Sequence, residues 1–535
     1  MLFSGTILIA LGFASYYQFT SDFAEHPQQH TVFDFFLTFL ACGTLSGLLL
    51  AYGRNGTGSL YRKEGIICVV LIWLITPWVA TIPFLTSGTL DNPLQAYFEM
   101  VSGFTTTGST VLQAKQFNPN TGKEEQIVRV IPGEIPTKYA FYGTVDPVVD
   151  PQAGTVVKTG VEALGKALLF WRSFTQWLGG VGIVVLFVAV LPALGIGGKI
   201  LFQSEAPGPV KEGVTPRIKD TAVQLWKIYL LLTVLSISSL MLVKQDLPLF
   251  EAVNITFATL ATGGFSTQNA SLAGYNSAPL EWVVILFMIA GSINFSLYYF
   301  LIKGKFYKLV DPEFILFLVL TAVFSFAVVY PIIGATLESL TGQPDSLFSV
   351  SEAIRAGVFQ LVSAQSTTGF VTANYNIWPY SAQVVMLVAM FVGGMSGSTA
   401  GGIKVIRQYM LFKIGQNKVE SIFRPDHLKV LKLSGREVDH SLMLTVLCFF
   451  LIVVAVATLG TYLYVLDGID LETAIGLTAC MMNNTGLSFR MAGPDSSCAF
   501  LSDFSLIVAS AQMIAGRLEY YAVLAVLVPA FWRKE

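Results

Sequence analysis

Four short stretches of the chain combine threonine or asparagine with glycine, a set of residues that suits the coordination of a dehydrated cation. They are Thr106-Thr107-Gly108, Thr262-Gly263-Gly264, Thr367-Thr368-Gly369 and Asn484-Thr485-Gly486. Backbone carbonyls and threonine hydroxyls can replace the water shell of an ion, and glycine reaches the positive φ that turns a carbonyl toward an axis. One Thr-x-Gly is usually only a turn. Four copies at equivalent places predict four quarters of one ion filter, and the fourth copy departs most from the others.

A short apolar segment with a glutamate near its start precedes each of these stretches. The glutamates are Glu99, Glu251, Glu352 and Glu472. Segments of about 15 residues are too short to cross a bilayer, and non-helical backbone at membrane depth is stable only where it lines water or is buried in protein. The pattern therefore predicts short helices whose negative carboxyl ends point at a cavity and favour a cation there. At the opposite, positive ends, the glutamates are expected to cap the helices rather than to bind ions.

The composition indicates a membrane protein. The chain is 53% hydrophobic and 12% charged, with a mean hydropathy of +0.64, whereas globular chains carry roughly 25% charged residues. A net charge of -2 and the lack of a basic block give no reason to expect a nucleic-acid partner. No nucleophile–base motif, metal cluster, Rossmann glycine fingerprint or P-loop is present, so we expect neither an enzyme nor a cofactor.

Ten apolar stretches are each long enough for a membrane-spanning helix, which needs about 20 residues. They lie near residues 2–18, 32–52, 65–86, 168–197, 223–243, 279–302, 311–334, 382–412, 441–466 and 501–531. The last eight stretches form four consecutive pairs, and one glutamate-and-filter segment lies between the two members of each pair. This repetition predicts an all-α polytopic membrane protein in which two leading helices precede four pseudo-repeated helix–pore helix–filter–helix units around one central pore. The expected boundaries are 1–60 for the leading helices and 61–198, 199–305, 306–436 and 437–535 for the four units.

Lysine and arginine gather after the second, fourth, sixth, eighth and tenth stretches, which predicts that these ends face the cytoplasm. They include Arg54, Lys63, Lys199, Lys211, Arg217, Lys303, Lys308, Arg407, Lys413, Arg424, Lys429, Lys432, Arg436, Arg533 and Lys534. The filter stretches then face outside, and the C-terminus lies inside. A polar segment at about 113–162 interrupts the first unit and is expected to be an extracellular insertion of open role, with strands at Ile127–Pro136 and Ala140–Val149.

The eighth apolar stretch contains a run that a straight helix does not hold well. Its residues include Gly393, Gly394, Gly397, Ser398, Thr399, Gly401 and Gly402. Each glycine costs about 1 kcal/mol relative to alanine in a helix, so we expect the helix to open at 393–404 into a loop just below the third filter stretch. A phosphate-binding loop is excluded because Ile403 follows Gly402. A glycine patch for close helix packing remains an alternative.

Two charged residues, Arg517 and Glu519, lie in the middle of the last apolar stretch. A charge at that depth costs at least about 2.5 kcal/mol and normally faces water or a partner. We expect Arg517 to lie beneath the filter, to donate to carbonyls of the glycine-rich loop and to repel cations. The alternative is a structural salt bridge between Arg517 and Glu519.

The four filter stretches, together with Phe170 to Gly182, Gly393 to Lys404 and Gly516 to Glu519, resemble the Trk/Ktr/HKT superfamily of potassium transport proteins. Within it, the two leading helices are similar to the bacterial TrkH/TrkG type. The resemblance covers nearly the whole chain except the insertion. It implies that Gly108, Gly264, Gly369 and Gly486 are the filter glycines, that glycine rather than serine at 108 favours potassium, and that 393–404 is an intramembrane gating loop.

This resemblance also implies gated, channel-like potassium uptake across the bacterial cytoplasmic (inner) membrane. The chain would contact lipid, form a homodimer with one pore per chain, and bind a soluble nucleotide-binding ring of the TrkA type through basic loops at 199–226 and 407–440. Potassium would be the substrate, without a further cofactor. A proton- or sodium-coupled potassium symporter is the alternative, and it would need a titratable relay in the ion path.

Overall fold

The computed structural model describes residues 2–20, 28, 30–54, 62–118, 120–131, 136–150, 154–185, 218–338, 340, 346–423, 432–433, 436–437 and 440–533. Within them, each of the ten apolar stretches contains one helix or two. The helices are α1 (Leu2–Thr20), α2 (Thr31–Gly53), α3 (Arg62–Ala80) continued by α4 (Ile82–Thr86), α6 (Lys166–Val185), α8 (Ile218–Val243), α10 (Ala278–Ser292) with α11 (Phe295–Ile302), α12 (Pro312–Ile332), α14 (Tyr380–Val392) with α15 (Val405–Phe423), α16 (His440–Leu466), and α18 (Asp503–Arg517) with α19 (Tyr521–Leu527). Residues 186–197 of the fourth stretch lie outside the described residues.

Several of these helices are long and apolar enough to cross a membrane. In the described part of the chain, five single helices meet that test, in α2, α3–α4, α8, α12 and α16, and the pair α10–α11 meets it with a bend of 97°. Their outer faces expose large apolar side chains, including Leu48, Phe326 and Tyr330, each about 70% accessible. Soluble proteins rarely expose such continuous apolar surfaces to water, so the outer faces of these helices are suited to contact lipid.

Four short helices lie between the long ones, as predicted. They are α5 (Pro93–Phe104), α9 (Leu249–Leu260), α13 (Val350–Gln365) and α17 (Leu471–Asn483). Three begin at a side-chain cap, in which Asn92, Ser349 and Asp470 accept a hydrogen bond from a backbone N–H of the first turn. The carboxyl halves of all four are buried, so these helices form the centre of the molecule.

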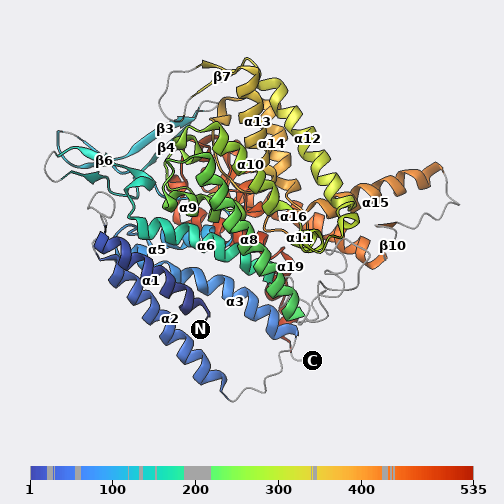
Figure 1. Cartoon of the computed structure of the whole chain (residues 1–535), viewed down its shortest axis with the longest axis horizontal. Coiled ribbons are helices and arrows are strands. Elements are labelled where there is room, and N and C mark those ends of the chain that lie inside the picture. Colours follow the sequence, from blue (N-terminus) through green and yellow to red (C-terminus); the bar gives the residue numbers. More distant parts are fainter. Residues whose placement is uncertain are drawn as a thin grey trace.

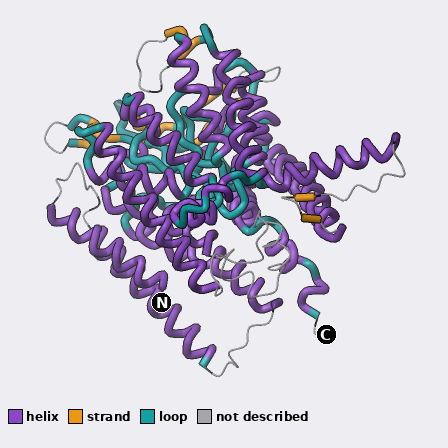
Figure 2. Tube along the Cα trace, turned by 45° about the vertical axis from the view of Figure 1, so that its right-hand side comes forward, coloured by secondary structure: helices purple, strands orange, loops and turns teal. Residues whose placement is uncertain are grey.

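The packing of the short helices follows a closed cycle. Each contacts the long helix before it and the one after it: α5 packs on α3 and α6, α9 on α8 and α10, α13 on α12 and α14, and α17 on α16 and α18. Each also contacts one helix of the preceding unit, in the pairs α6–α9, α10–α13, α14–α17 and α18–α5. The last pair connects the fourth unit to the first and so closes the cycle. Loops run through the middle of the helical body that results (Figure 2).

The insertion forms short antiparallel hairpins at one end of the molecule (Figure 1). Its strands are β1 (Gln116–Phe117), β2 (Glu124–Glu125), β3 (Ile127–Ile131), β4 (Thr137–Phe141), β5 (Val148–Val149) and β6 (Val156–Lys158), paired β1–β2, β3–β4 and β5–β6. The second predicted strand, Ala140–Val149, was wrong: β4 begins and ends earlier. The pairing of β4 with β3 places Tyr139 opposite Arg129. Gly143, after the end of β4, lies too close to the backbone of Ala114 and Lys115 to leave room for a side chain. The expected turn at 132–133 lies outside the described residues.

Two side chains attach the β3–β4 hairpin to the fourth unit. Arg129 forms an ion pair with Asp495 at 3.2 Å. Tyr139 donates its hydroxyl to Asp470, the N-cap residue of α17, at 2.5 Å. Burial, and then the Asp470 carboxylate, raise the pKa of Tyr139, which keeps the phenol protonated as a donor. The insertion therefore contacts the start of a short helix from another unit.

Further short elements complete the described chain. They are the strands β7 (Thr336–Leu337), β8 (Ser346–Leu347), β9 (Lys432–Leu433) and β10 (Arg436–Glu437), and the 3₁₀ turns Gly160–Ala163, Ser271–Tyr275, Phe306–Leu309, Tyr375–Ile377, Arg490–Ala492, Cys498–Phe500 and Pro529–Trp532.

Candidate cation site

The four predicted filter stretches adopt one local conformation. The first residues, Thr106, Thr262, Thr367 and Asn484, have φ angles of 55°, 53°, 55° and 54°, a region that residues other than glycine seldom occupy. The next residue of each stretch donates its N–H to the carbonyl five positions earlier. These bonds are Thr107 to Ser102 (2.9 Å), Gly263 to Ala258 (2.8 Å), Thr368 to Ser363 (2.9 Å) and Thr485 to Cys480 (3.0 Å). The same turn therefore follows each short helix despite the different side chains.

The third residues of the stretches bring the four loops into a closed ring. A Cβ atom on Gly108 would lie well under 3.0 Å from the carbonyl oxygen of Gly263. Gly264 stands in the same relation to Thr368, Gly369 to Thr485, and Gly486 to Thr107. The four glycines have φ angles of 88°, 74°, 90° and 76° and together line one cavity of about 110 Å³. Only glycine fits these positions, because each faces the backbone of the next loop.

Side-chain hydrogen bonds support the first, third and fourth loops, and those of the fourth loop differ from the hydroxyl pairs of the other two. The hydroxyls of Thr105 and Thr107 lie 2.8 Å apart, and those of Ser366 and Thr368 lie 2.7 Å apart. Asn484 donates to the Thr107 hydroxyl at 3.0 Å and to the Met513 carbonyl at 2.9 Å. The asparagine that makes the fourth stretch unusual thus connects it to the first.

Three of the four glutamates lie at the positive ends of the short helices, as expected, and of these Glu352 forms a cap. This residue forms a capping box with Ser349, whose hydrogen bonds hold the pKa of Glu352 below its usual value. Glu251 and Glu472 lie in the first turn, but Glu251 accepts hydrogen bonds from Thr267 and Tyr275, and Glu472 pairs with Arg490. Glu99 was placed wrongly, because α5 starts at Pro93 and puts Glu99 in its middle, fully buried.

The glycine-rich stretch forms a loop, as predicted, between the end of α14 at Val392 and the start of α15 at Val405. The backbone N–H of Gly401 donates to the Thr367 hydroxyl at 2.6 Å, so the loop contacts the third filter stretch directly. The Thr399 hydroxyl donates to the carbonyls of Leu260 at 2.9 Å and Gly291 at 3.0 Å. Leu260 is the last residue of α9, so the loop lies at the carboxyl end of that short helix. Several glycines of the loop also pack closely against neighbouring backbone, as Gly401 does against the Asn483 carbonyl.

Glu313 holds both sides of this loop. Its buried carboxylate oxygen Oε1 accepts from the backbone N–H groups of Ser396 at 2.8 Å and of Ile406 at 3.3 Å. The sequence reasoning missed this residue. Its sequence pattern gave no clear signal, because Asp311-Pro312-Glu313 is an ordinary start of a helix, where a carboxylate is stabilising in any case.

Arg517 is 4% exposed and bridges two segments. It donates to the Thr399 carbonyl of the glycine-rich loop at 2.9 Å and to the Gly179 carbonyl of α6 at 3.2 Å. The alternative salt bridge with Glu519 is wrong, because the Glu519 carboxylate pairs with Arg407. The last span is also not one helix: α18 ends at Arg517, and Glu519 and Tyr520 have φ angles of 55° and 58°. This break turns the two charges in different directions.

A model of the TrkH family, described as a cation transport protein, matches residues 150–534 of the chain. The chain belongs to the TrkH family.

Relatives of known type agree with this assignment over the whole chain. The Trk system potassium uptake protein TrkH of Escherichia coli K12 is 30% identical over 538 residues, which cover 100% of this chain and 97% of the relative. The Trk system potassium uptake protein TrkG of the same organism is 31% identical and covers 95% and 93%. The crystal structure of the potassium transporter TrkH from Vibrio parahaemolyticus matches with a TM-score of 0.78 at 28% identity, over 99% of this chain and 97% of that one. The family resemblance predicted from the sequence is confirmed, and the matched proteins are membrane transporters rather than enzymes.

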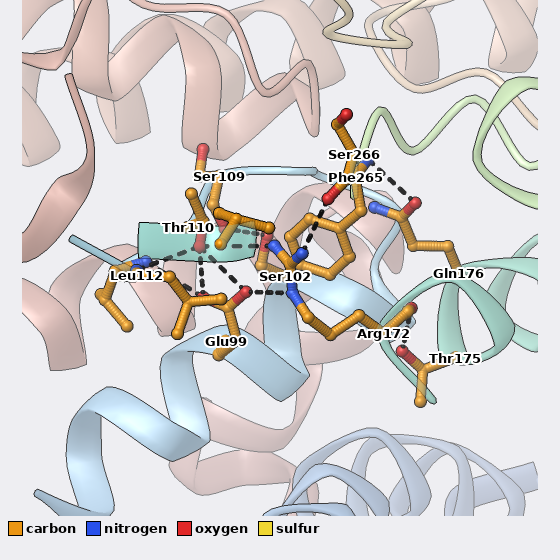
Figure 3. Close-up of polar contacts among 12 residues, drawn as sticks. Glu99, Ser102, Ser109, Thr110, Leu112, Arg172, Thr175, Gln176, Phe265 and Ser266 are labelled. Carbon is orange, nitrogen blue, oxygen red and sulfur yellow. Dashed lines mark hydrogen bonds and ion pairs between the residues drawn. The ribbon is translucent and has the colours of Figure 1, made fainter. Parts of the chain in front are cut away.

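This TrkH-family protein also contains a buried ion pair beside the ring that the sequence reasoning did not predict. Arg172 of α6 and Glu99 of α5 are 1% and 0% exposed, and Arg172 Nε lies 2.9 Å from Glu99 Oε1 (Figure 3). Arg172 also donates to the Ser266 carbonyl at 3.0 Å, while Glu99 accepts from the Thr110 hydroxyl and the Val111 N–H, each at 3.0 Å. An arginine inside an apolar span was the available signal, since it requires a partner.

Proposed function

We propose that this TrkH-family protein is the pore-forming subunit of a potassium uptake system and conducts the ion through one pore formed by its four loops. The closed ring of glycines carries this proposal. Gly108, Gly264, Gly369 and Gly486 each abut the carbonyl of the next loop and line one cavity. A ring of backbone carbonyls can replace the hydration shell of a monovalent cation, and the printed names of the relatives indicate that this cation is potassium.

The charges around the ring favour the binding of a cation there. Four short helices end at the loops, so their partial negative charges point at the ring. The positive charge of Arg172, which lines the cavity, is balanced by Glu99. The filter residues are therefore Thr106, Thr107, Gly108, Thr262, Gly263, Gly264, Thr367, Thr368, Gly369, Asn484, Thr485 and Gly486, with one stretch from each of the proposed units 61–198, 199–305, 306–436 and 437–535.

The glycine-rich loop and Arg517 form the proposed gate. The gate residues are Gly393, Gly394, Gly397, Ser398, Thr399, Gly401, Gly402 and Arg517. The loop contacts the third filter stretch through Gly401 and the end of α9 through Thr399, and Arg517 holds Thr399. Opening the pore would require the loop to leave these partners.

Replacing Glu313 with alanine is expected to raise uptake severalfold, because the loop loses the carboxylate that accepts from Ser396 and Ile406. Each lost hydrogen bond is worth about 1 kcal/mol, or roughly fivefold in an equilibrium. Glu313→Gln keeps a side-chain oxygen in the same place and should stay near the wild type. Rubidium uptake by proteoliposomes measures both variants. Equal behaviour of the glutamine and alanine variants would contradict this role for Glu313.

The assembly follows the same proposal. The chain forms a homodimer with one pore each in the bacterial cytoplasmic membrane, with filters outside, the C-terminus inside, and a TrkA-type ring on the inner face. Helix α15 projects from the body (Figure 1) and carries the half-buried Lys413 and the exposed Lys418. Residues 199–217 and 424–431, with Lys199, Lys211, Arg217, Arg424 and Lys429, lie outside the described residues, as does Lys534; the side chains of Lys432 and Arg436 are likewise outside them.

Uptake by the purified chain tests the proposed function. The protein is reconstituted into liposomes loaded with potassium, and isotopic rubidium is added outside. We expect saturable uptake that external potassium competes away. A folded protein that gives no uptake above protein-free liposomes under any condition would overturn the proposal.

A proton- or sodium-coupled symporter is separated from this pore by the reversal potential. Among the described residues that line the ring cavity, none is a carboxylate, and Arg172 is the charged one. We expect the reversal potential across a reconstituted bilayer to follow the potassium gradient alone. A shift with the proton or sodium gradient would favour the symporter.

A further inference from the structure

The second filter stretch differs from the other three at its middle residue. The other loops have a threonine there, Thr107, Thr368 or Thr485, whereas the second loop has Gly263. Glycine has no side chain to restrict its backbone, and Gly264 follows directly. Two adjacent glycines at a proposed ion-binding carbonyl would let that carbonyl rotate away from the ring, unless another group holds it.

Gln176 occupies the space of the missing side chain, and its carboxamide lies beside Phe265 and Ser266 (Figure 3). A Cβ atom built on Gly263 would lie 2.5 Å from the Gln176 carboxamide carbon. The Gln176 Nε2 donates to the Gly263 carbonyl at 2.7 Å, and its Oε1 accepts from the Phe265 N–H at 3.1 Å. The side chain is 0% exposed. Because one end donates and the other accepts, the two bonds fix the orientation of the amide and hold the loop on both sides of Gly264.

The support comes from a different unit of the fold. Gln176 lies on α6, the helix that follows the first filter stretch, and reaches the second loop. Arg172 lies one helical turn earlier on the same face and donates to the Ser266 carbonyl of that loop at 3.0 Å. Its guanidinium also lies 4.1 Å from the centre of the Phe265 ring. Helix α6 therefore holds the second loop at three sites, Gly263, Phe265 and Ser266.

We propose that Gln176 is a positioning residue of the filter that determines its preference for potassium over sodium. This inference rests on the proposed function of the ring. The Gly263 carbonyl faces Gly108 of the neighbouring loop, as the threonine carbonyls do in the other three. Gln176 keeps it there, and by donating to it makes this oxygen a weaker ligand than its three counterparts. The position of the second loop's carbonyl, and the electric field that this carbonyl contributes to the ring, therefore depend on a side chain outside the loop.

A double-mutant exchange tests the proposal. Gln176→Ala removes the support, and Gly263→Thr places a side chain where Gln176 already lies. The double variant Gln176→Ala/Gly263→Thr gives the second loop the threonine of the other three loops in an emptied space. Thr485 shows that a threonine fits this position without a hydrogen-bond partner for its hydroxyl. Gln512→Ala is the matched control, because Gln512 is a buried glutamine of α18 whose side chain accepts from Tyr464 of α16.

The readout is the ratio of half-inhibitory sodium to potassium concentrations in rubidium uptake by proteoliposomes. We expect the ratio to fall about tenfold in each single variant, the factor that corresponds to about 1.4 kcal/mol. It should return to within about threefold of the wild type in the double variant and stay unchanged in Gln512→Ala. A wild-type ratio in Gln176→Ala, or a double variant as impaired as the worse single one, would overturn the role of Gln176. Absence of uptake by the wild type would instead overturn the function on which the inference rests.

Discussion

Replacing Gly369 with serine should lower rubidium uptake by at least about 100-fold, which corresponds to about 2.7 kcal/mol on the barrier. Gly369 has a φ of 90°, where a side chain strains the backbone by about 1–3 kcal/mol. The new Cβ would also overlap the Thr485 carbonyl of the next loop. Each filter glycine lies against a carbonyl of the next loop. Displacing the Thr485 carbonyl therefore disturbs the contact between the third and fourth loops. Initial uptake rates in proteoliposomes with equal amounts of folded protein measure the effect.

The control for this variant is Gly334→Ser. Gly334 has a φ of 76°, so a serine there suffers similar backbone strain, but a Cβ atom would meet nothing within 4 Å. We expect Gly334→Ser to lose some stability and to keep its uptake. If Gly369→Ser transports as well as Gly334→Ser, the four glycines do not form the narrow part of the ion path.

Replacing Arg517 with alanine should raise uptake about tenfold or more. Two unit charges about 8 Å apart interact by about 2 kcal/mol at an effective dielectric constant of 20, so removing the buried positive charge of the proposed gate is expected to lower the barrier for a cation. The variant also frees the glycine-rich loop, because Arg517 connects Thr399 to Gly179. Flux is measured in proteoliposomes without a regulatory partner, and a monodisperse profile in detergent shows that the fold is intact.

Arg517→Lys separates the two effects. A lysine keeps the charge but lacks the planar fork that reaches two carbonyls at once. If charge is the main barrier, the lysine variant should transport near the wild-type rate. If the bridge is the main barrier, it should approach the alanine variant. Unchanged or lower flux in a folded Arg517→Ala would contradict the assignment of Arg517 to the gate.

Much of this fold was predictable because membrane segments carry strong local signals. Apolar length located the ten helical stretches, and a run of glycines located the loop between Val392 and Val405. The starts of the short helices were less clear from the glutamates alone. At α5 the better signal was Asn92 followed by Pro93, a capping residue and a proline at the first helical position, which places Glu99 in the middle of the helix.

Contacts between distant residues were not predictable from local pattern. Arg172 finds Glu99 and Gln176 finds Gly263, partners that are 73 and 87 positions away. Arg407 is 112 positions from Glu519 and replaces the nearer Arg517 as its partner. That choice depends on the backbone break after Arg517, which no proline or glycine in 518–520 announces. Such pairs follow from the cyclic packing of four units, which only the three-dimensional structure reveals.

The proposed cation binds on the axis between the four loops. Anomalous scattering from crystals of the full chain grown in rubidium tests it most directly. We predict a peak bounded by the carbonyls of Thr107, Gly263, Thr368 and Thr485, with the four glycines around it. An ordered ring without a peak, or a rubidium peak only elsewhere in the molecule, would contradict it.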